Sequence, residues 1–157
     1  MYRIWVGIKL LIMLPGTALH ELAHYVPALL FNLKPSLSLL PSFKHNTAGR
    51  VTFRTPAFGL AKTIIALMPL LWWAALGLLL SEFQLFKLSI ADPYRIDFTL
   101  MYNPSLNLIQ YLLLVFVSIQ LFWAGGLSRK DWENAIDGLA SLSGILAISA
   151  LLLWWNT

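Results

Sequence analysis

The main pattern along the chain is a series of four long apolar stretches separated by polar segments. The stretches cover Ile8–Phe31, Leu60–Leu80, Leu106–Gly125 and Trp132–Trp155. A helix needs about 20 apolar residues to cross the hydrocarbon layer of a bilayer, and each stretch has about that length. The pattern predicts an all-α integral membrane protein with about four transmembrane helices. No repeat or low-complexity tract interrupts it, so we expect one domain over residues 1–157.

The polar segment after the first apolar stretch, Asn32–Pro56, carries a strand pattern. Val51-Thr52-Phe53-Arg54 alternates apolar and polar side chains of types that favour strands. We predict a small β-hairpin in this first loop, with strands over Leu37–Phe43 and Arg50–Arg54 around a turn at His45–Gly49. A free edge of such a hairpin can hold an extended peptide by strand addition. A plain connecting loop is the alternative.

The second polar segment and two prolines predict interruptions of the helical pattern. The segment Ser81–Ser105 contains the turn signals Asp92-Pro93 and Asn103-Pro104. We expect a surface loop with a short interfacial helix there. Within the apolar stretches, Pro69 predicts a kink and Pro15-Gly16 predicts a break.

Composition supports the membrane assignment and narrows the chemistry. Hydrophobic residues make up 59% of the chain and charged residues 11%, whereas soluble domains average about 25% charged residues. The chain has no cysteine, which excludes disulfides and thiolate metal ligands. The formal net charge is +4, yet no run of basic residues indicates nucleic-acid binding, so lysine and arginine are expected to set membrane topology.

The distribution of lysine and arginine predicts an orientation. The first and third loops carry Lys34, Lys44, Arg50, Arg54, Lys62, Arg129 and Lys130, and the opposite side carries Arg3, Lys9, Lys87 and Arg95. Loops rich in these residues stay in the cytoplasm. We therefore expect the first and third loops inside and both termini outside, in a multi-pass protein of a prokaryotic cytoplasmic membrane.

The motif with the most chemical content lies inside the first apolar stretch and reads His20-Glu21-Leu22-Ala23-His24. This is an H-E-x-x-H pattern, and residues i and i+4 of a helix share a face, so both imidazoles can bind one metal ion. Glu21 lies close enough to take a proton from a metal-bound water. Ionisable side chains are costly at membrane depth, which favours a functional role. A polar stripe for packing or proton transfer is the alternative.

A third metal ligand is expected near the start of the fourth apolar stretch. Catalytic Zn²⁺ usually has three protein ligands, and in a chain without cysteine the third should be a carboxylate. A rise of about 1.5 Å per residue places His20 and His24 nearer the first-loop side, where that stretch begins. Asp131 and Asp137 lie there. Asp131 also suits a helix cap with Ser128, and Asp137 lies deeper, so both are candidates.

The order of several short motifs resembles that of membrane metalloproteases related to site-2 proteases, the M50-like group. These motifs are Pro15-Gly16-Thr17, the H-E-x-x-H segment, Gly49-Arg50-Val51, Met68-Pro69-Leu70 and Ser128-x-x-Asp131. In small members of that group a Pro-Ser-x-x-Asp turn supplies the carboxylate, which implies Asp131, although Leu127 replaces the proline here. In larger site-2 proteases a Leu-Asp-Gly motif does so, and Ile136-Asp137-Gly138 resembles it.

Together these observations predict a zinc-dependent intramembrane endopeptidase. Zn²⁺ would be held by His20, His24 and Asp131, with Asp137 as the runner-up, and Glu21 would be the general base. The expected partners are the lipid bilayer and a membrane protein or peptide substrate, with a regulatory membrane partner left open. The alternative is a non-catalytic metal-binding or scaffold subunit of a membrane complex.

Overall fold

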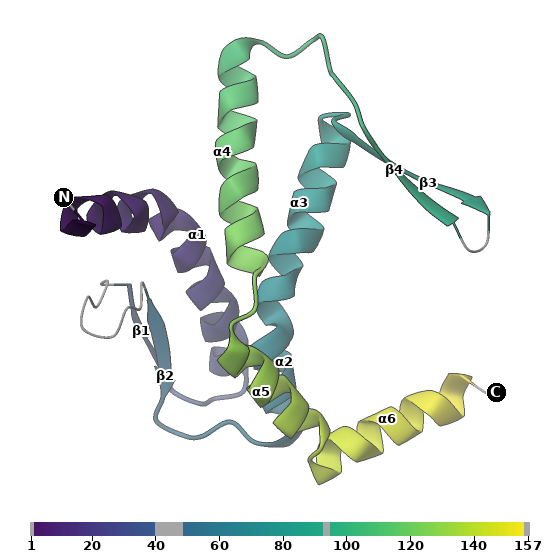
Figure 1. Cartoon of the computed structure of the whole chain (residues 1–157). Helices are drawn as coiled ribbons and strands as arrows, with labels where there is room; N and C mark the ends of the chain where they lie inside the picture. Colours follow the sequence, from purple (N-terminus) through teal and green to yellow (C-terminus); the bar gives the residue numbers. More distant parts are fainter. Residues whose placement is uncertain (1, 40–48, 93–94, 156–157) are drawn as a thin grey trace.

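The computed structural model describes residues 2–39, 49–92 and 95–155, which form six α-helices, one short 3-10 helix and two β-hairpins (Figure 1). In chain order the elements are α1 (Tyr2–Leu30), β1 (Pro35–Ser38), β2 (Arg50–Phe53), α2 (Gly59–Leu67), η1 (Met68–Leu70), α3 (Leu71–Glu82), β3 (Phe86–Asp92), β4 (Arg95–Leu100), α4 (Leu108–Gly125), α5 (Arg129–Leu139) and α6 (Leu142–Trp155). The structure is mostly helical, as the sequence predicts.

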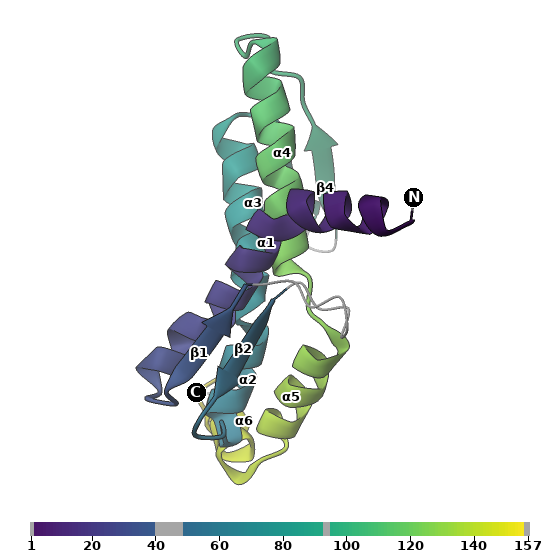
Figure 2. The ribbon, with the colours of Figure 1, turned by 90° about the vertical axis from the view of Figure 1, so that its left-hand side faces the viewer.

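The helices meet at one junction and diverge from it. α3 and α4 run side by side on one side of the junction, and α2 and α5 pack together on the other side (Figures 1 and 2). α1 contacts α2, η1, α4 and both strands of the first hairpin. Segments far apart in sequence therefore come together at this junction.

Two helical segments of the described residues are long and apolar enough to cross a membrane. They are Gly59–Glu82, which joins α2, η1 and α3, and Leu108–Gly125, which is α4. The pair α5 and α6 adds a third candidate only if both helices, bent by 72° at their break, form one span. α1, which the sequence predicts as a span, is not among these candidates. The described residues thus provide two or three candidate spans where the sequence predicts about four.

The prediction of one helix over Trp132–Trp155 is wrong, because α5 ends at Leu139 and α6 begins at Leu142. At the break, the Ser141 hydroxyl donates to the carbonyl of Gly138 and accepts from the backbone N–H of Gly144. A serine that bonds nearby backbone groups in this way competes with the helical ladder. The C-terminus lies opposite the first loop only if the bent pair is one span, and that topology stays a prediction.

The hairpin predicted in the first loop is present. β1 and β2 pair antiparallel, with Leu37 opposite Val51, and the Ser36 and Thr52 hydroxyls lie 2.7 Å apart across the strands. Phe53 packs against a small buried cluster of Ala28, Leu33 and Ile65, which ties the hairpin to α1 and α2. Residues 40–48, which include most of the predicted turn and the end of the first predicted strand, lie outside the described residues.

The loop expected over Ser81–Ser105 is a second antiparallel hairpin, so the predicted interfacial helix is wrong. β3 pairs with β4, with Phe86 opposite Leu100 and an irregularity between Ile90 and Asp92. The run from Phe86 to Ile90 alternates apolar and polar residue types, which is a strand signal. This alternation of apolar and polar residues could have predicted the strand. The turn signals in the same segment favour a loop, and they make the alternation harder to recognise.

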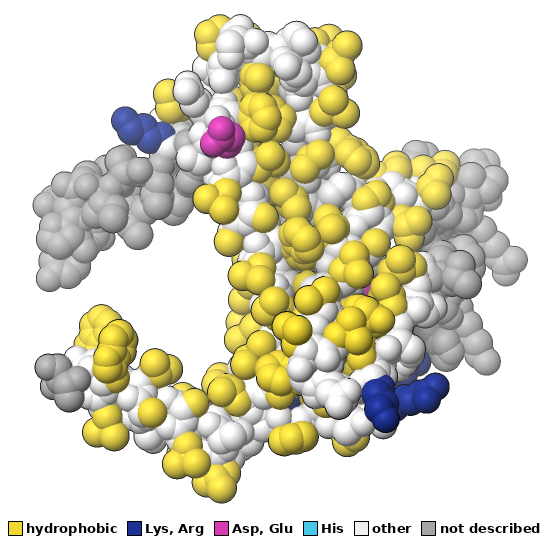
Figure 3. Space-filling model, turned by 180° about the vertical axis from the view of Figure 1, so that it is seen from behind, with side chains coloured by type: hydrophobic (Ala, Val, Ile, Leu, Met, Phe, Trp, Pro, Cys, Tyr) yellow, Lys and Arg dark blue, Asp and Glu magenta, His cyan; other side chains and the backbone are white. Residues whose placement is uncertain are grey.

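The surface of the helices is largely apolar. Figure 3 shows apolar side chains spread over the described surface of one face, with few charged side chains among them. Large apolar residues are strongly exposed on α4 and α6, including Leu108, Ile109, Leu146 and Trp155. Helices that are apolar all round belong in a protein interior or in a bilayer, which is compatible with a membrane location.

Candidate metal centre

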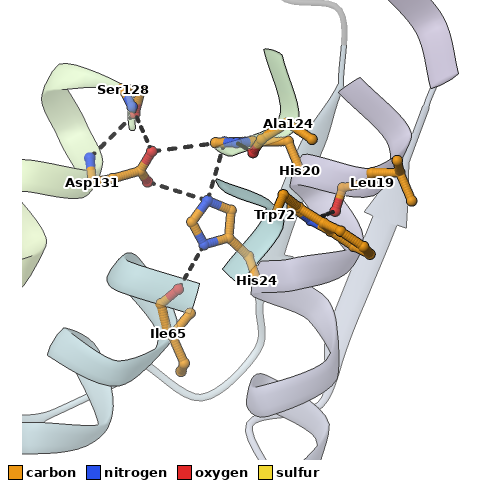
Figure 4. A network of polar contacts seen from close by, with 8 residues as sticks. All are labelled: Leu19, His20, His24, Ile65, Trp72, Ala124, Ser128 and Asp131. Carbon is orange, nitrogen blue, oxygen red and sulfur yellow. Dashed lines mark hydrogen bonds and ion pairs between the residues drawn. The ribbon is translucent and has the colours of Figure 1, made fainter. Parts of the chain in front are cut away.

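Three side chains from two distant elements converge beside the junction (Figure 4). His20 and His24 come from α1, and Asp131 comes from the first turn of α5. The two Nε2 atoms lie 3.2 Å apart. His24 Nε2 lies 3.3 Å from Asp131 Oδ1, and His20 Nε2 lies 3.7 Å from Asp131 Oδ2. Among the described residues, these three form the one group able to hold a metal ion.

The backbone carbonyl of Ile65 orients His24, and this carbonyl lacks its usual helical donor because of Pro69. The Nδ1 atom of His24 lies 2.8 Å from the carbonyl oxygen of Ile65. A carbonyl can only accept, so Nδ1 carries a proton, and in the neutral ring Nε2 is then the atom with the lone pair. In an α-helix the Ile65 carbonyl would accept from residue 69, but Pro69 has no N–H. The residue that interrupts the second helix therefore also fixes the tautomer of His24.

His20 is oriented in the same way by the end of a helix. Its Nδ1 atom lies 3.0 Å from the carbonyl oxygen of Ala124. Ala124 is in the last turn of α4, where carbonyls have no helical donor. The Nδ1–H group of His20 supplies that donor, and its Nε2 lone pair faces His24. Histidines that ligate metals commonly donate their other N–H to a carbonyl or carboxylate, which sets the ring orientation.

The three donors fit a zinc ion. With both Nδ1 atoms protonated, the facing Nε2 atoms and the carboxylate of Asp131 are all acceptors, and such acceptors repel one another unless a cation or proton lies among them. Ligands at about 2.0–2.1 Å from a tetrahedral zinc lie about 3.3 Å from each other. The separations of 3.2 and 3.3 Å match this spacing, and the third separation, 3.7 Å between His20 Nε2 and Asp131 Oδ2, is longer by about 0.4 Å. Two imidazoles and one carboxylate are also the donor set of catalytic zinc sites with an open fourth position.

The carboxylate of Asp131 both caps α5 and faces the two histidines. Ser128 is the N-cap of α5, and its hydroxyl accepts from the backbone N–H of Asp131 at 3.2 Å. In return, Asp131 Oδ2 accepts from the backbone N–H of Ser128 at 2.8 Å, which completes a capping box. Oδ1 faces His24. The cap thus holds the carboxylate in place, and its capping oxygen Oδ2 is also the oxygen that lies 3.7 Å from His20 Nε2.

The runner-up ligand, Asp137, lies outside this group. Its carboxylate pairs with Lys62 of α2, with 2.9 Å between Oδ2 and Nζ. The Asp137 side chain is 66% exposed, as expected for a surface ion pair. The structure therefore brings Asp131, and not Asp137, to His20 and His24, while the assignment of Asp131 as a ligand stays a prediction.

Glu21 faces the first hairpin and is half-buried. A Cβ atom added to Gly49 would lie 2.8 Å from Glu21 Cγ and 3.3 Å from Glu21 Oε1, so only glycine allows this approach. The backbone N–H of Val51 donates to the Glu21 carboxylate. The start of β2 therefore holds the side chain predicted to be the general base.

The residue that sequence analysis missed is Gln120 of α4. Its side-chain Oε1 accepts from the Gly16 N–H at 2.8 Å, and its Nε2 donates to the carbonyl of Ile12 at 3.1 Å. In a regular helix Gly16 would bond Ile12 directly, so the Gln120 amide is inserted into the ladder of α1. A buried glutamine in an apolar stretch was the available signal.

No protein-family model, curated protein or solved structure matches this chain.

Proposed function

We propose that this chain is a zinc-dependent intramembrane endopeptidase. The observation that carries the proposal is the convergence of His20, His24 and Asp131, with both Nδ1 atoms engaged by carbonyls and both Nε2 lone pairs facing the carboxylate. The H-E-x-x-H spacing places Glu21 next to this group on α1. The apolar surface of the helices supports a site inside or beside a bilayer, and we propose a multi-pass protein of a prokaryotic cytoplasmic membrane.

In the proposed reaction, each residue of the site has its own role. A Zn²⁺ ion held by His20, His24 and Asp131 would lower the pKa of water and polarise the scissile carbonyl. Glu21 takes the proton of the attacking water and passes it to the nitrogen of the leaving amine. The Val51 N–H holds the Glu21 carboxylate beside the site. The Ser128 cap keeps Asp131 from rotating, because its second oxygen is already bonded.

The outer edge of β2 is suited to hold the substrate chain. Arg54 donates to Lys34 across the first hairpin, so in the antiparallel register Val51 and Phe53 direct their backbone groups away from β1. The bond from Val51 to Glu21 agrees with this register. An extended substrate strand added at this edge would place its backbone next to Glu21. The substrate segment must first unfold, because a helix has no free backbone groups to offer.

A non-catalytic metal-binding or scaffold subunit is the second candidate. The observation that favours it is that Asp131 caps α5 and Glu21 bonds the first hairpin. Both acidic residues therefore have structural contacts that a non-catalytic protein could retain. The two functions differ in one respect: only the peptidase needs Glu21 to exchange protons.

The test uses the purified chain in detergent, reconstituted with Zn²⁺ and incubated with unfolded β-casein. The proposal requires close to one equivalent of zinc by elemental analysis and peptide products that vanish in Glu21→Gln, while this variant keeps its zinc. Zinc binding without any products would favour the scaffold function. Less than about a tenth of an equivalent of any transition metal would contradict the metal centre itself.

A further inference from the structure

An aromatic cavity opens directly beside the candidate metal centre. It has a volume of about 330 Å³, and His20 and Ser128 contribute to its lining. Ser128 holds Asp131 through the capping box. Two of the three donor side chains are therefore linked to the wall of this cavity, one directly and one through its cap.

Three partly exposed aromatic side chains contribute to the lining of the cavity. Trp73 of α3 and Phe122 and Trp123 of α4 line it. The Trp73 indole donates to the carbonyl of Phe122 at 3.0 Å, and the two rings stack with centroids 6.0 Å apart. Gly125 lies against the Trp73 ring, where any larger residue would displace it. The wall is therefore held in position by a hydrogen bond, ring stacking and backbone contact.

The cavity also borders the hairpin that is proposed to hold the substrate. Thr17 lines the cavity. Its Cγ2 atom lies 3.1 Å from where a Cβ on Gly49 would be, at the start of β2. A strand lying along β2 can therefore send one side chain past Thr17 into the cavity while its backbone stays beside Glu21.

The volume and the lining of the cavity determine which kinds of side chain it can hold. Its volume is about ten times the roughly 30 Å³ that one water molecule occupies in the liquid. This is enough for the ring of phenylalanine or tryptophan or for a branched aliphatic side chain. Within the described residues, the lining contains no lysine, arginine or carboxylate that could pair with a charged side chain. Aromatic walls favour aromatic occupants through offset or edge contacts.

We infer that this cavity is the specificity pocket of the peptidase and receives a large aromatic or aliphatic side chain next to the scissile bond. The inference rests on the proposed function, and it adds the substrate class. Gly126 is a suitable position for a substitution that tests this inference. Its backbone, with φ −67° and ψ 122°, suits any residue, and an added Cβ meets only the Trp123 carbonyl at 3.4 Å.

The first experiment measures binding without catalysis. Phenylalanine hydroxamate and glycine hydroxamate share a zinc-chelating group, and they differ only in the side chain beside it. On the zinc-loaded wild-type protein, calorimetry should show about tenfold tighter binding of the phenylalanine compound, which corresponds to about 1.4 kcal/mol. Gly126→Val should reduce this ratio to near one. Equal affinities for the two compounds on the wild-type protein would overturn the inference.

A matched control uses another glycine, at which an added Cβ atom would contact no neighbouring atom. A Cβ added to Gly77 of α3 has no neighbour within 4 Å, so Gly77→Val makes the same chemical change away from the cavity. It should keep the tenfold ratio. Phe122→Ala, which widens the cavity, serves as the second variant and should raise the relative affinity of a tryptophan hydroxamate. If Gly126→Val and Gly77→Val behave alike, the cavity does not select the side chain.

The second experiment reads the cleavage sites. Products of β-casein are mapped by mass spectrometry, with Glu21→Gln as the background. The pocket predicts that large apolar residues dominate one position beside the cleaved bond, and that Gly126→Val shifts this position to small residues. Products without such a preference overturn the pocket and leave the peptidase intact. Absence of products contradicts the peptidase, while the hydroxamate ratio still decides whether the cavity selects side chains.

Discussion

The Nδ1 atom of His24 lies 2.8 Å from the carbonyl oxygen of Ile65, four residues before Pro69. This contact links a helix break to the candidate metal centre, because the proline removes the N–H that would otherwise occupy the carbonyl. The ring of His24 is thereby held with Nε2 toward His20 and Asp131. The 3-10 turn at Met68–Leu70 is therefore part of the site's construction.

Replacing Pro69 with alanine should weaken metal binding without unfolding the protein. The new backbone N–H can donate to the Ile65 carbonyl and compete with His24, and loss of such an outer contact typically lowers metal affinity by about 10–100-fold. Alanine is also the better helix former. Zinc affinity, measured by competition with a chelator of known affinity, should therefore fall while the apo helical signal persists. Pro56→Ala, at an exposed position, is the control and should bind zinc normally. Unchanged affinity in Pro69→Ala would refute this role of the proline.

The candidate metal ligands were predicted from the sequence, but the contacts that orient them were not. His20 and His24 follow from helical spacing alone. The sequence preferred Asp131 and kept Asp137 as the runner-up; the fold separates them, because Asp131 lies beside the histidines while Asp137 pairs with Lys62. The roles of Ile65 and Ala124 are carried by backbone carbonyls, which have no sequence signature of their own. The proline four residues after Ile65 was the clue to one of them.

Gln120 should act as a positioning residue for His20. Its amide bridges Gly16 and Ile12 of α1, one helical turn before His20. In Gln120→Leu these two backbone groups must either pair directly, which straightens α1, or stay unsatisfied at a cost of about 1–3 kcal/mol each. Either result should disturb His20 and reduce zinc affinity by at least about tenfold.

Replacing zinc with Co²⁺ tests this effect through a spectroscopic signal that a change in protein stability alone would not alter. The visible spectrum of bound Co²⁺ reflects ligand geometry, so Gln120→Leu should alter its shape and intensity. Ser118→Ala on the same helix is the matched control and should leave the spectrum unchanged. A Gln120→Leu protein with the wild-type spectrum and affinity would show that the inserted amide serves α1 only.

The two aspartates should separate in a paired substitution. Asp131→Asn retains an oxygen that can accept from the Ser128 N–H, so the cap survives while the charged ligand is lost. Zinc affinity should fall strongly with little change in stability. Asp137→Asn removes only the ion pair with Lys62, which is exposed on the aspartate side and worth about 0–1 kcal/mol. Full zinc occupancy in both variants would reject Asp131 as the third ligand.

Two apolar stretches and the first hairpin were predictable from the sequence, whereas the second hairpin and the break between α5 and α6 were not. The candidate spans Gly59–Glu82 and Leu108–Gly125 closely follow two predicted stretches. The bend between α5 and α6 was missed because it depends on the hydrogen bonds of Ser141, a residue common inside helices. Periodicity averages over about a turn and does not detect a single serine that bonds the backbone.

Membrane topology gives the last prediction. Thr55 precedes the span Gly59–Glu82, Ser128 follows the span Leu108–Gly125, and Leu100 of β4 lies between the two. Two crossings place Thr55 and Ser128 on one side and Leu100 on the other. The excess of lysine and arginine near the first two positions puts that side in the cytoplasm.

Single cysteines in this cysteine-free chain can test the arrangement. In intact cells an impermeant maleimide should label Leu100→Cys, because the native residue is 83% exposed. Thr55→Cys and Ser128→Cys should react only after permeabilisation. The reverse pattern would contradict the orientation but leave the metal centre possible, since His24 and Asp131 would still share a side. Labelling of Thr55→Cys and Ser128→Cys from opposite sides would be more serious. It would mean that one of the two segments does not cross, and α5 could not then bring Asp131 to the histidines of α1 across the bilayer.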